Sequence, residues 1–376
     1  MLEINREISS AEGRLLKRLQ ALVEVESPSE DATAVNRASA MVAGWAAALG
    51  AKAKRHKQKI FGDVLELQFG AASRGHSRVM LLAHLDTVWP MGTLPKMPWR
   101  EADGKIYGPG VLDMKAGVVM ALEAIAALQQ LGKVRPITLL LNSDEEVGSK
   151  VSRPITEAIA RECAAVFVLE PAQGLAYKTS RKGVGHFGLR VEGVAAHSGV
   201  DFQNGHSAVL EMARLVEKIS GFTDLRRGIT VNAGVISGGT RSNVVAAECS
   251  AEVDARVVTA ADAARVEKMF RSLKVIDRAC RLTVSGGINR PPMERKPGTI
   301  ALFHKACALA AEMGFALDEA TTGGGSDGNF TAALGIPTLD GMGAVGAGAH
   351  AAQEHVVKKH LVERAALLAG MIAAVD

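Results

Sequence analysis

Seven His, Asp and Glu residues of this sequence lie in short motifs where their side chains could bind a divalent metal ion or transfer a proton. Imidazole nitrogens and carboxylate oxygens are the usual ligands of hydrolytic zinc sites. A pair of zinc ions about 3.5–4 Å apart needs one shared carboxylate and about two further ligands for each ion. Five of the seven residues make up that count, namely His84, Asp113, Glu146, Glu170 and His350. The other two, Asp86 and Glu145, are then available for supporting hydrogen bonds and acid–base catalysis.

Each of these motifs also has an ordinary structural explanation when it is taken alone. His84–Asp86 could be polar loop residues, and Asp144–Glu146 could lie at a helix N-terminus, where acids are favoured. Asp113 could cap a helix, and His350 could belong to a surface loop. Together they are harder to explain, because strands ending side by side in acids would crowd unpaired carboxylates. A divalent cation removes that electrostatic cost.

The apolar runs place these polar residues at the ends of predicted strands. We expect strands at Arg78–Ala83, Ile137–Leu141 and Ala165–Leu169, with a helix at Lys115–Leu131 between the first two. Strands that alternate with helices predict an α/β fold, with a mostly parallel sheet and helices on both faces. In such sheets ligands bind at the carboxyl ends of the strands, which is where the candidate residues lie.

The pattern changes between about residues 182 and 290. Half-exposed strands there alternate with two amphipathic helices, in the order β-α-β-β-α-β, which predicts a small antiparallel α+β domain inserted into the first one. We therefore predict a first domain formed by residues 1–181 and 291–376, which would carry the candidate site, and an inserted domain at residues 182–290. The expected strands and helices are Gly185–Val191, Ser207–Ile219, Ile229–Ile236, Ala246–Val258 and Ala260–Leu273.

A glycine run at residues 323–325, centred on Gly324, would let the backbone approach a substrate closely. We do not expect a phosphate-binding loop, because no Gly-Lys-Ser/Thr follows and no strand is predicted before the run. The sequence has no Gly-x-Ser-x-Gly elbow either, so a serine triad is not expected.

Length and composition exclude several other classes of function. A chain of 376 residues predicts two domains, and 48% hydrophobic with 22% charged residues is typical of a globular protein. The net charge is only +4 and the basic residues are scattered, so we expect no nucleic-acid partner. We see no apolar signal core or run long enough for a membrane span, and none of the four cysteines forms a CxxC pair. A reducing cytoplasm is therefore the expected location.

Nine motifs, in order, resemble the signatures of the aminoacylase/carboxypeptidase family of two-zinc hydrolases. They are HLDTVWP, YGPGVLDMKAG, NSDEEVGS, LEP, AAHSG, GGTRSN, DAR, GGGSDGN and the late histidine. The resemblance extends from about Leu15 to the predicted C-terminal helix. Within the family, the DEE motif followed by GS and the loop Gly323–Asp327 look closest to bacterial glutamate carboxypeptidases of the carboxypeptidase G type.

The resemblance implies a metal ligand set. His84 and Glu170 would bind one zinc ion, Glu146 and His350 would bind the other, and Asp113 would bridge them. The family implies two Zn²⁺ per subunit, with Co²⁺ or Mn²⁺ as substitutes.

The resemblance also implies roles for the residues beside the ligands. Asp86 would accept a hydrogen bond from the far nitrogen of His84, and the peptide between Asp113 and Met114 would be cis. Zinc lowers the pKa of bound water to about 7, and Glu145 would act as general base for that water and pass the proton to the leaving amine.

The resemblance further implies that residues 182–290 are a lid and dimerisation domain, and that the catalytic domain is formed by residues 1–181 and 291–376. By resemblance, His197 would reach across a homodimer interface and, with Asn243, stabilise the developing oxyanion. Arg256 and Arg290 would bind the substrate carboxylate, although a surface ion pair is the ordinary alternative for both.

The family resemblance implies hydrolysis of an amide bond next to a free carboxylate, with release of a C-terminal amino acid such as glutamate. An N-acyl-amino-acid deacylase of the acetylornithine or succinyl-diaminopimelate type, a di- or tripeptidase and a metal-free binding relative are the alternatives. The sequence does not decide between Lys178, Arg181 and Lys182 as the residue that would select glutamate.

Overall fold

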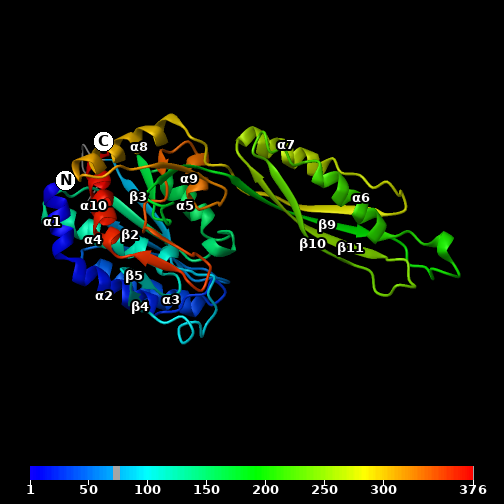
Figure 1. The fold of residues 1–376 in the computed structure, drawn as a ribbon, viewed down its shortest axis with the longest axis horizontal. Coiled ribbons are helices and arrows are strands. Elements are labelled where there is room, and N and C mark those ends of the chain that lie inside the picture. Colours follow the sequence, from blue (N-terminus) through cyan, green and yellow to red (C-terminus); the bar gives the residue numbers. More distant parts are fainter. Residues whose placement is uncertain (71–76, 376) are drawn as a thin grey trace. The chain divides into compact units, whose positions relative to one another are not determined.

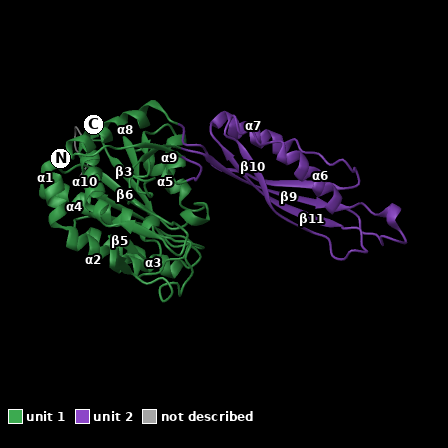
Figure 2. Cartoon of the chain, viewed as in Figure 1, with its two compact units in different colours: residues 1–180, 295–321, 326–376 green, residues 181–294, 322–325 purple. Residues whose placement is uncertain are grey.

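The computed structural model describes residues 1–70 and 77–375, which form two compact units (Figures 1 and 2). Unit 1 comprises Met1–Ser180, Arg295–Thr321 and Ser326–Asp376. Unit 2 comprises Arg181–Glu294 and the short segment Thr322–Gly325. Most of unit 2 is therefore one insertion in the sequence of unit 1. The predicted role of this insertion in substrate closure and dimerisation stays a prediction.

Unit 1 is built around a six-stranded, mostly parallel sheet. Strands β6, β3, β7 and β14 are parallel to one another, whereas β1 and β2 add an antiparallel edge. The sheet confirms the predicted fold class, although the sequence did not reveal its antiparallel edge. In spatial order the strands are β1 (Lys52–His56), β2 (Val64–Phe69), β6 (Ile137–Asn142), β3 (Val79–His84), β7 (Ala165–Val168) and β14 (Thr338–Leu339).

Helices cover both faces of this sheet because its central strands are apolar on both sides. On β3, Leu81 packs into the larger hydrophobic core, whereas Met80 and Leu82 pack into a second core on the other face. Helix α5 (Arg153–Ala160) lies against the second core. The helices that contribute to the larger core are α1 (Leu2–Ser10), α2 (Glu12–Val23), α3 (Ala32–Ala47), α4 (Ala116–Gln130), α8 (Pro297–Glu312) and α10 (Lys359–Ala374).

Two small sheets complete unit 1. In the first, β15 (Gly346–Ala347) and β16 (His355–Val357) form a hairpin that pairs with β5 (Lys105–Tyr107), which in turn pairs with β4 (Arg100–Ala102). The second joins β8 (Tyr177–Arg181) to β13 (Glu319–Thr322). Strand β13 leads directly into the glycine run, so the expectation that no strand precedes that run was wrong. The short helix α9 (Gly328–Ala333) follows it.

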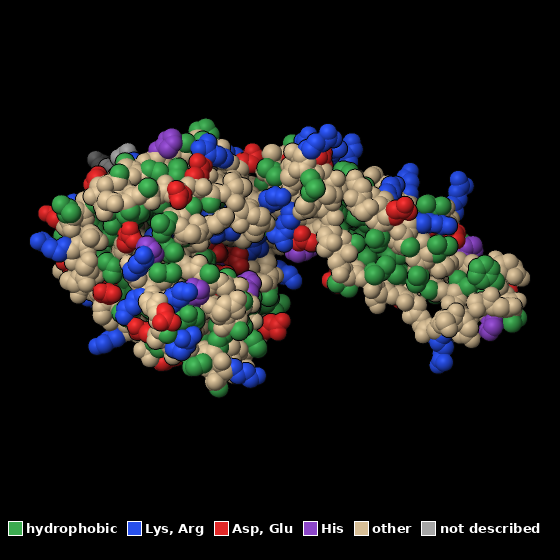
Figure 3. Space-filling model, viewed as in Figure 1, with side chains coloured by type: hydrophobic (Ala, Val, Ile, Leu, Met, Phe, Trp, Pro, Cys, Tyr) green, Lys and Arg blue, Asp and Glu red, His purple; other side chains and the backbone are tan. Residues whose placement is uncertain are grey.

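Unit 2 is a four-stranded antiparallel sheet with two helices on one face. The helices α6 and α7 pack on alternate residues of β9, such as Phe187 and Leu189, while the residues between them face away from that core. Hydrophobic side chains also gather on the face of this unit shown in Figure 3. The chain order matches the predicted β-α-β-β-α-β pattern: β9 (Gly183–Glu192), α6 (Ala208–Ser220), β10 (Thr230–Gly238), β11 (Glu248–Val257), α7 (Ala260–Arg271) and β12 (Arg281–Arg290).

Within residues 1–70 and 77–375, no helix has both the length and the apolar character that a membrane span requires.

Candidate metal centre

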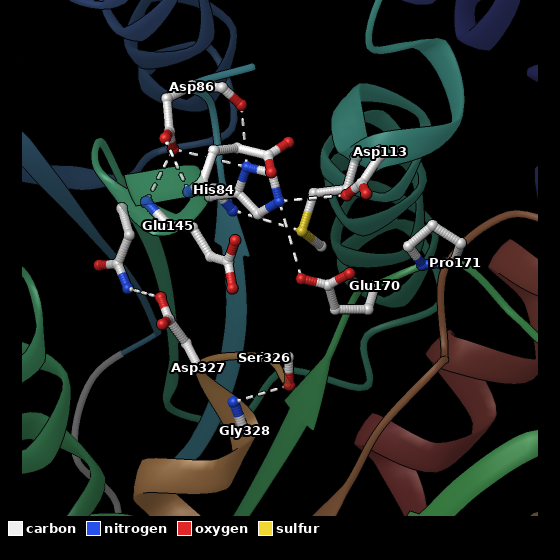
Figure 4. A network of polar contacts seen from close by, with 12 residues as sticks. His84, Asp86, Asp113, Glu145, Glu170, Pro171, Ser326, Asp327 and Gly328 are labelled. Atoms are coloured by element: carbon white, nitrogen blue, oxygen red, sulfur yellow. Dashed lines mark hydrogen bonds and ion pairs between the residues drawn. The ribbon is translucent and has the colours of Figure 1, made fainter. Parts of the chain in front are cut away.

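The candidate ligands of unit 1 converge at the carboxyl ends of three neighbouring parallel strands. His84 ends β3 and lies in register with Asn142, the last residue of β6. The acidic residues Glu145 and Glu146 follow β6 in a short 3-10 turn, and Glu170 follows β7. Because β3 lies between β6 and β7, the three strand ends bring these side chains together (Figure 4).

Asp113 lies at the centre of the cluster and faces a different histidine with each carboxylate oxygen. Its Oδ1 is 3.2 Å from Nε2 of His84, and its Oδ2 is 3.4 Å from Nε2 of His350. On the first side, Oε1 of Glu170 is 3.7 Å from Nε2 of His84. On the second side, Oε2 of Glu146 is 3.1 Å from Nε2 of His350. The five side chains therefore form two donor groups that share one carboxylate.

This arrangement fits two divalent cations. Two donors bound to one tetrahedral zinc, each about 2.0–2.2 Å from it, are about 3.3–3.6 Å apart, and the four separations measured here lie near that value. The ligand atoms of His84, Asp113 and Glu146 all lie within 4.8 Å of one another, as do those of His84, Glu145 and Glu170. In addition, Oε1 of Glu146 is buried and has no hydrogen-bond partner among the described residues. A buried, unsatisfied carboxylate oxygen is costly unless a cation or proton reaches it.

The electrostatics of the cluster point the same way. Burial lowers the pKa of the His84 imidazole, but the neighbouring carboxylates of Asp113 and Asp86 more than offset this and raise it well above its ordinary value. Hydrogen bonds to Asp113 and Glu146 raise the pKa of His350 to about 10. Burial raises the pKa of Glu146. Protons on the histidines therefore balance the acids until a cation replaces them.

Asp86 is placed differently from the prediction. The Nδ1 atom of His84 lies 2.9 Å from the backbone carbonyl of Asp86, whereas the nearer carboxylate oxygen is 3.5 Å away. The buried Asp86 carboxylate instead accepts the hydroxyl of Ser29 at 2.7 Å and the backbone N–H groups of Glu145 and Glu146 at 3.2 and 3.1 Å. Asp86 thus orients the acidic turn by its side chain and the imidazole by its backbone.

The segment that carries Asp113 is irregular. Residues Val111–Lys115 include non-helical backbone angles at Asp113 and Met114, and the peptide between these two residues is cis, as the family resemblance implies. Helix α4 begins afterwards, with Lys115 at its N-cap and no side-chain cap. The alternative role of Asp113 as a helix cap is therefore not observed.

Two further sets of residues support the cluster. Asp327, labelled in Figure 4, accepts a hydrogen bond from Asn142 at 2.6 Å. It accepts another from the hydroxyl of Ser149. Asp327 therefore anchors the end of β6, whereas close approach of the glycine run 323–325 to a substrate stays a prediction. Sequence reasoning missed Glu354 altogether, because a single acid four residues after His350 resembles a surface residue.

The other candidate residues lie in unit 2, where they form two groups. The segments of His197 and Asn243 are adjacent, since the N–H of Ser198 donates to the carbonyl of Asn243 at 3.0 Å. Both His197 and Asn243 are exposed.

Arg256 and Arg290 form the second group, at the start of β9. Both pair in register with Val184, one from β11 and the other from β12. Arg256 binds the carboxylate of Asp254 at 2.9 and 2.8 Å. The carbonyl of Gly324 accepts a hydrogen bond from Arg181 at 3.3 Å.

Comparison with known proteins then assigns the family. The sequence model of peptidase family M20/M25/M40 matches residues 80–374, which is most of the chain. The chain belongs to this family. As an M20-family protein it is a metallo-hydrolase, which confirms the predicted family resemblance and enzyme class. Members of the family typically bind two metal ions, and the cluster around Asp113 is the candidate site for them.

Individual relatives of this M20-family hydrolase differ in activity. Carboxypeptidase G2 from Pseudomonas sp. is 29% identical over 88% of this chain and 82% of its own length. Acetylornithine deacetylase from Myxococcus xanthus is 27% identical over 54% of this chain and 56% of its own length. The crystal structure of aminopeptidase PepT from Bacillus cereus has a TM-score of 0.80 at 21% identity and covers 97% of this chain and 98% of its own, which establishes the shared fold.

Proposed function

We propose that this M20-family hydrolase is an exopeptidase that releases a C-terminal amino acid with a free carboxylate, with glutamate as the first candidate. The observation that carries the proposal is the pairing of Arg256 and Arg290 with the same residue, Val184, because both arginines then lie at one end of the sheet of unit 2. The similarity to carboxypeptidase G2 over most of both chains supports the same substrate class.

The arginine pair has the chemistry that a substrate carboxylate requires. A guanidinium group has five N–H donors in a plane, which match a carboxylate in two parallel hydrogen bonds. Asp254 is bound through Nε and Nη2 of Arg256, and Nη1 donates to the carbonyl of Gly323 at 3.4 Å. One N–H on Nη1 and one on Nη2 remain for the substrate. Arg290 is buried, which strengthens its interaction with an anion.

In unit 1, His84 and Glu170 would hold one divalent cation. Glu146 and His350 would hold a second cation. Asp113 would contribute to both sites. When bound, such cations act as Lewis acids and lower the pKa of water to about 7. Zinc is the first candidate, and Co²⁺ or Mn²⁺ could replace it in a carboxylate-rich site.

Glu145 is the proposed proton carrier. A carboxylate oxygen of Glu145 lies within 4.8 Å of the ligand atoms of His84 and Glu170, and so beside the proposed metal ligands. The carboxylate of Asp86 accepts the backbone N–H of Glu145 and holds this residue in place. The Glu145 carboxylate would accept a proton from the attacking water and donate it to the leaving amine. His197 and Asn243 would donate hydrogen bonds to the oxyanion that forms at the substrate carbonyl.

We further propose that the protein is a homodimer formed through unit 2 and that His197 acts on the metal centre of the partner subunit. Two exposed apolar residues, Val235 and Ile236, lie on the edge strand β10, where a second copy could pair. Hydrophobic side chains gathered on unit 2 in Figure 3 also favour an interface.

Deacylation of an N-acyl amino acid is the second candidate function. The similarity to acetylornithine deacetylase supports it, and the same metal ligands and the same proton carrier would serve that reaction. The two functions differ in the group that unit 2 would have to recognise, which makes them separable by substrate.

A substrate panel tests the proposal. We expect kcat/KM to be highest for N-acyl-L-glutamates and to fall about 10–100-fold when the α-carboxylate is replaced by an α-amide, since a charge-assisted hydrogen bond contributes about 1.5–3 kcal/mol. The panel includes acetylornithine, succinyl-diaminopimelate and tripeptides, with added Zn²⁺, Co²⁺ or Mn²⁺ and a chelator control. A preference for acetylornithine would favour the deacylase, and a requirement for a free amine would favour a peptidase of the tripeptidase type.

A pair of variants tests the part played by the arginines. We expect Arg256→Ala to reduce the discrimination between the free carboxylate and the α-amide. The matched control is Arg190→Ala, which removes an exposed arginine that pairs with Glu248 on the same sheet. Equal loss of discrimination in both variants would argue against a specific role for Arg256.

A further inference from the structure

Glu354 is a fully buried carboxylate outside the proposed ligand set. Its Oε1 accepts the backbone N–H groups of Leu112 at 2.9 Å and Asp113 at 3.1 Å. Its Oε2 accepts the backbone N–H of Gly110 at 3.0 Å and the indole N–H of Trp89 at 2.8 Å. Four donors thus converge on one side chain, and three of them belong to the segment that carries the shared carboxylate.

The position of Glu354 in the chain links two ligand segments. It lies in the connection between β15 and β16, the hairpin that also carries His350. Strand β16 pairs with β5, and the chain after β5 leads through Gly110 to Asp113. Glu354 therefore ties the backbone of Asp113 to the loop of His350.

Regular secondary structure does not hold the Asp113 segment in place. Asp113 has φ −114° and ψ 93°, and Met114 has φ −134° and ψ 40°, so neither residue has helical backbone angles. Backbone N–H groups that are not used in a helix need another acceptor when they are buried. For Leu112 and Asp113 that acceptor is Glu354.

We propose that Glu354 is a positioning residue, which holds Asp113 so that its two carboxylate oxygens face His84 and His350. The proposal rests on the two-cation centre of the proposed function but not on the identity of the substrate. If the orientation of Asp113 is lost, the donor groups that share it no longer form together. Replacement of Glu354 should therefore weaken the binding of two cations more than it lowers the stability of the fold.

Cobalt binding to the purified full-length protein, without substrate, tests this proposal. The metal-free protein is titrated with Co²⁺, and its visible absorption reports the number, affinity and coordination of the bound ions. For Glu354→Gln we expect at least one of the two ions to bind ten-fold or more weakly, with an altered spectrum, because the amide NH₂ group faces N–H donors. Wild-type affinity and spectrum for both ions in this variant would overturn the proposal.

Glu123→Gln is the matched control. Glu123 is also a buried carboxylate of unit 1, but it binds Arg14 and Arg18 from a position within helix α4. We expect this variant to lose thermal stability yet to bind two Co²⁺ ions as the wild type does. An equal loss of Co²⁺ affinity in both variants would mean that Glu354 acts only through general stability.

A second variant keeps the proposal testable if Glu354→Gln does not fold. Trp89→Phe removes one of the four donors and keeps an aromatic ring, so we expect a smaller weakening of Co²⁺ binding, between two- and five-fold. Unchanged binding in Trp89→Phe would then count against the proposal. A wild-type protein that binds fewer than two ions would overturn both this proposal and the metal centre, whereas an unexpected substrate would overturn only the proposed substrate class.

Discussion

The carboxylate of Asp86 accepts the backbone N–H of Glu145 at 3.2 Å, and this hydrogen bond joins the end of β3 to the acidic turn after β6. Its second oxygen accepts the next N–H, that of Glu146, at 3.1 Å. Asp86 is fully buried, so little solvent competes for these bonds. One side chain thus sets the direction of both acidic residues, one proposed as a proton carrier and the other as a metal ligand.

Asp86→Asn should therefore impair the site without unfolding the protein. One oxygen of the amide can still accept a hydrogen bond, but its NH₂ group would face a backbone N–H. We expect kcat to fall about 10–100-fold, the range found when residues that orient metal ligands are replaced. Steady-state kinetics with metal analysis would measure this. Ser29→Ala, which removes only the hydroxyl donor to Asp86, is the control and should have a smaller effect.

Glu145→Gln tests the proton carrier directly. The amide has nearly the same size but cannot accept a proton at neutral pH, so we expect kcat to fall by about 10²–10⁴-fold. Metal content should stay at two ions per chain, because the proposed ligands are unchanged. Elemental analysis and kinetics on the same preparation would check both expectations. Substantial turnover by this variant would exclude Glu145 as the base, and loss of one ion would instead make it a ligand.

Metal binding should release protons. In the cation-free protein the pKa of His350 is raised to about 10 by Asp113 and Glu146, so the imidazole is protonated at pH 7. A cation can bind only the neutral ring, and its apparent affinity should therefore rise with pH until the pH approaches about 10. Calorimetric titration with Zn²⁺ in buffers of different ionisation enthalpy would measure the release, for which we expect at least about one proton per chain. Identical heats in all buffers would contradict this expectation.

The sequence predicted those parts of the site that follow regular elements. Buried strands ending at His84 and before Glu170 could be recognised by their apolar runs, and parallel pairing then brought the ends together. Features that depend on irregular backbone could not be predicted in this way. Neither the preference of His84 for the carbonyl of Asp86 nor the four donors around Glu354 has a signature in residue type or spacing. Strand β13 escaped prediction because its four residues, EATT, are mostly polar or small.

His197 is accessible to a second copy of the chain. Its ring is exposed, and its Nδ1 accepts only the N–H of Gly199 at 3.2 Å among the hydrogen bonds described for it, so Nε2 is available to a ligand or to another chain. If His197 completes the site of the partner subunit, one intact site forms when a His197→Ala chain pairs with a Glu145→Ala chain. For equal amounts of the two chains, unfolded and refolded together, random pairing into symmetric dimers should restore about a quarter of wild-type activity.

Each variant alone provides the control for this experiment and should stay nearly inactive, because each homodimer lacks the same group in both sites. Size-exclusion chromatography with light scattering would establish that the mixture is dimeric. Activity of the mixture no higher than the mean of the two homodimers would indicate that His197 serves the metal centre of its own chain or has no catalytic role. Restoration of activity would require both a dimer and a shared site, since neither chain carries both His197 and Glu145.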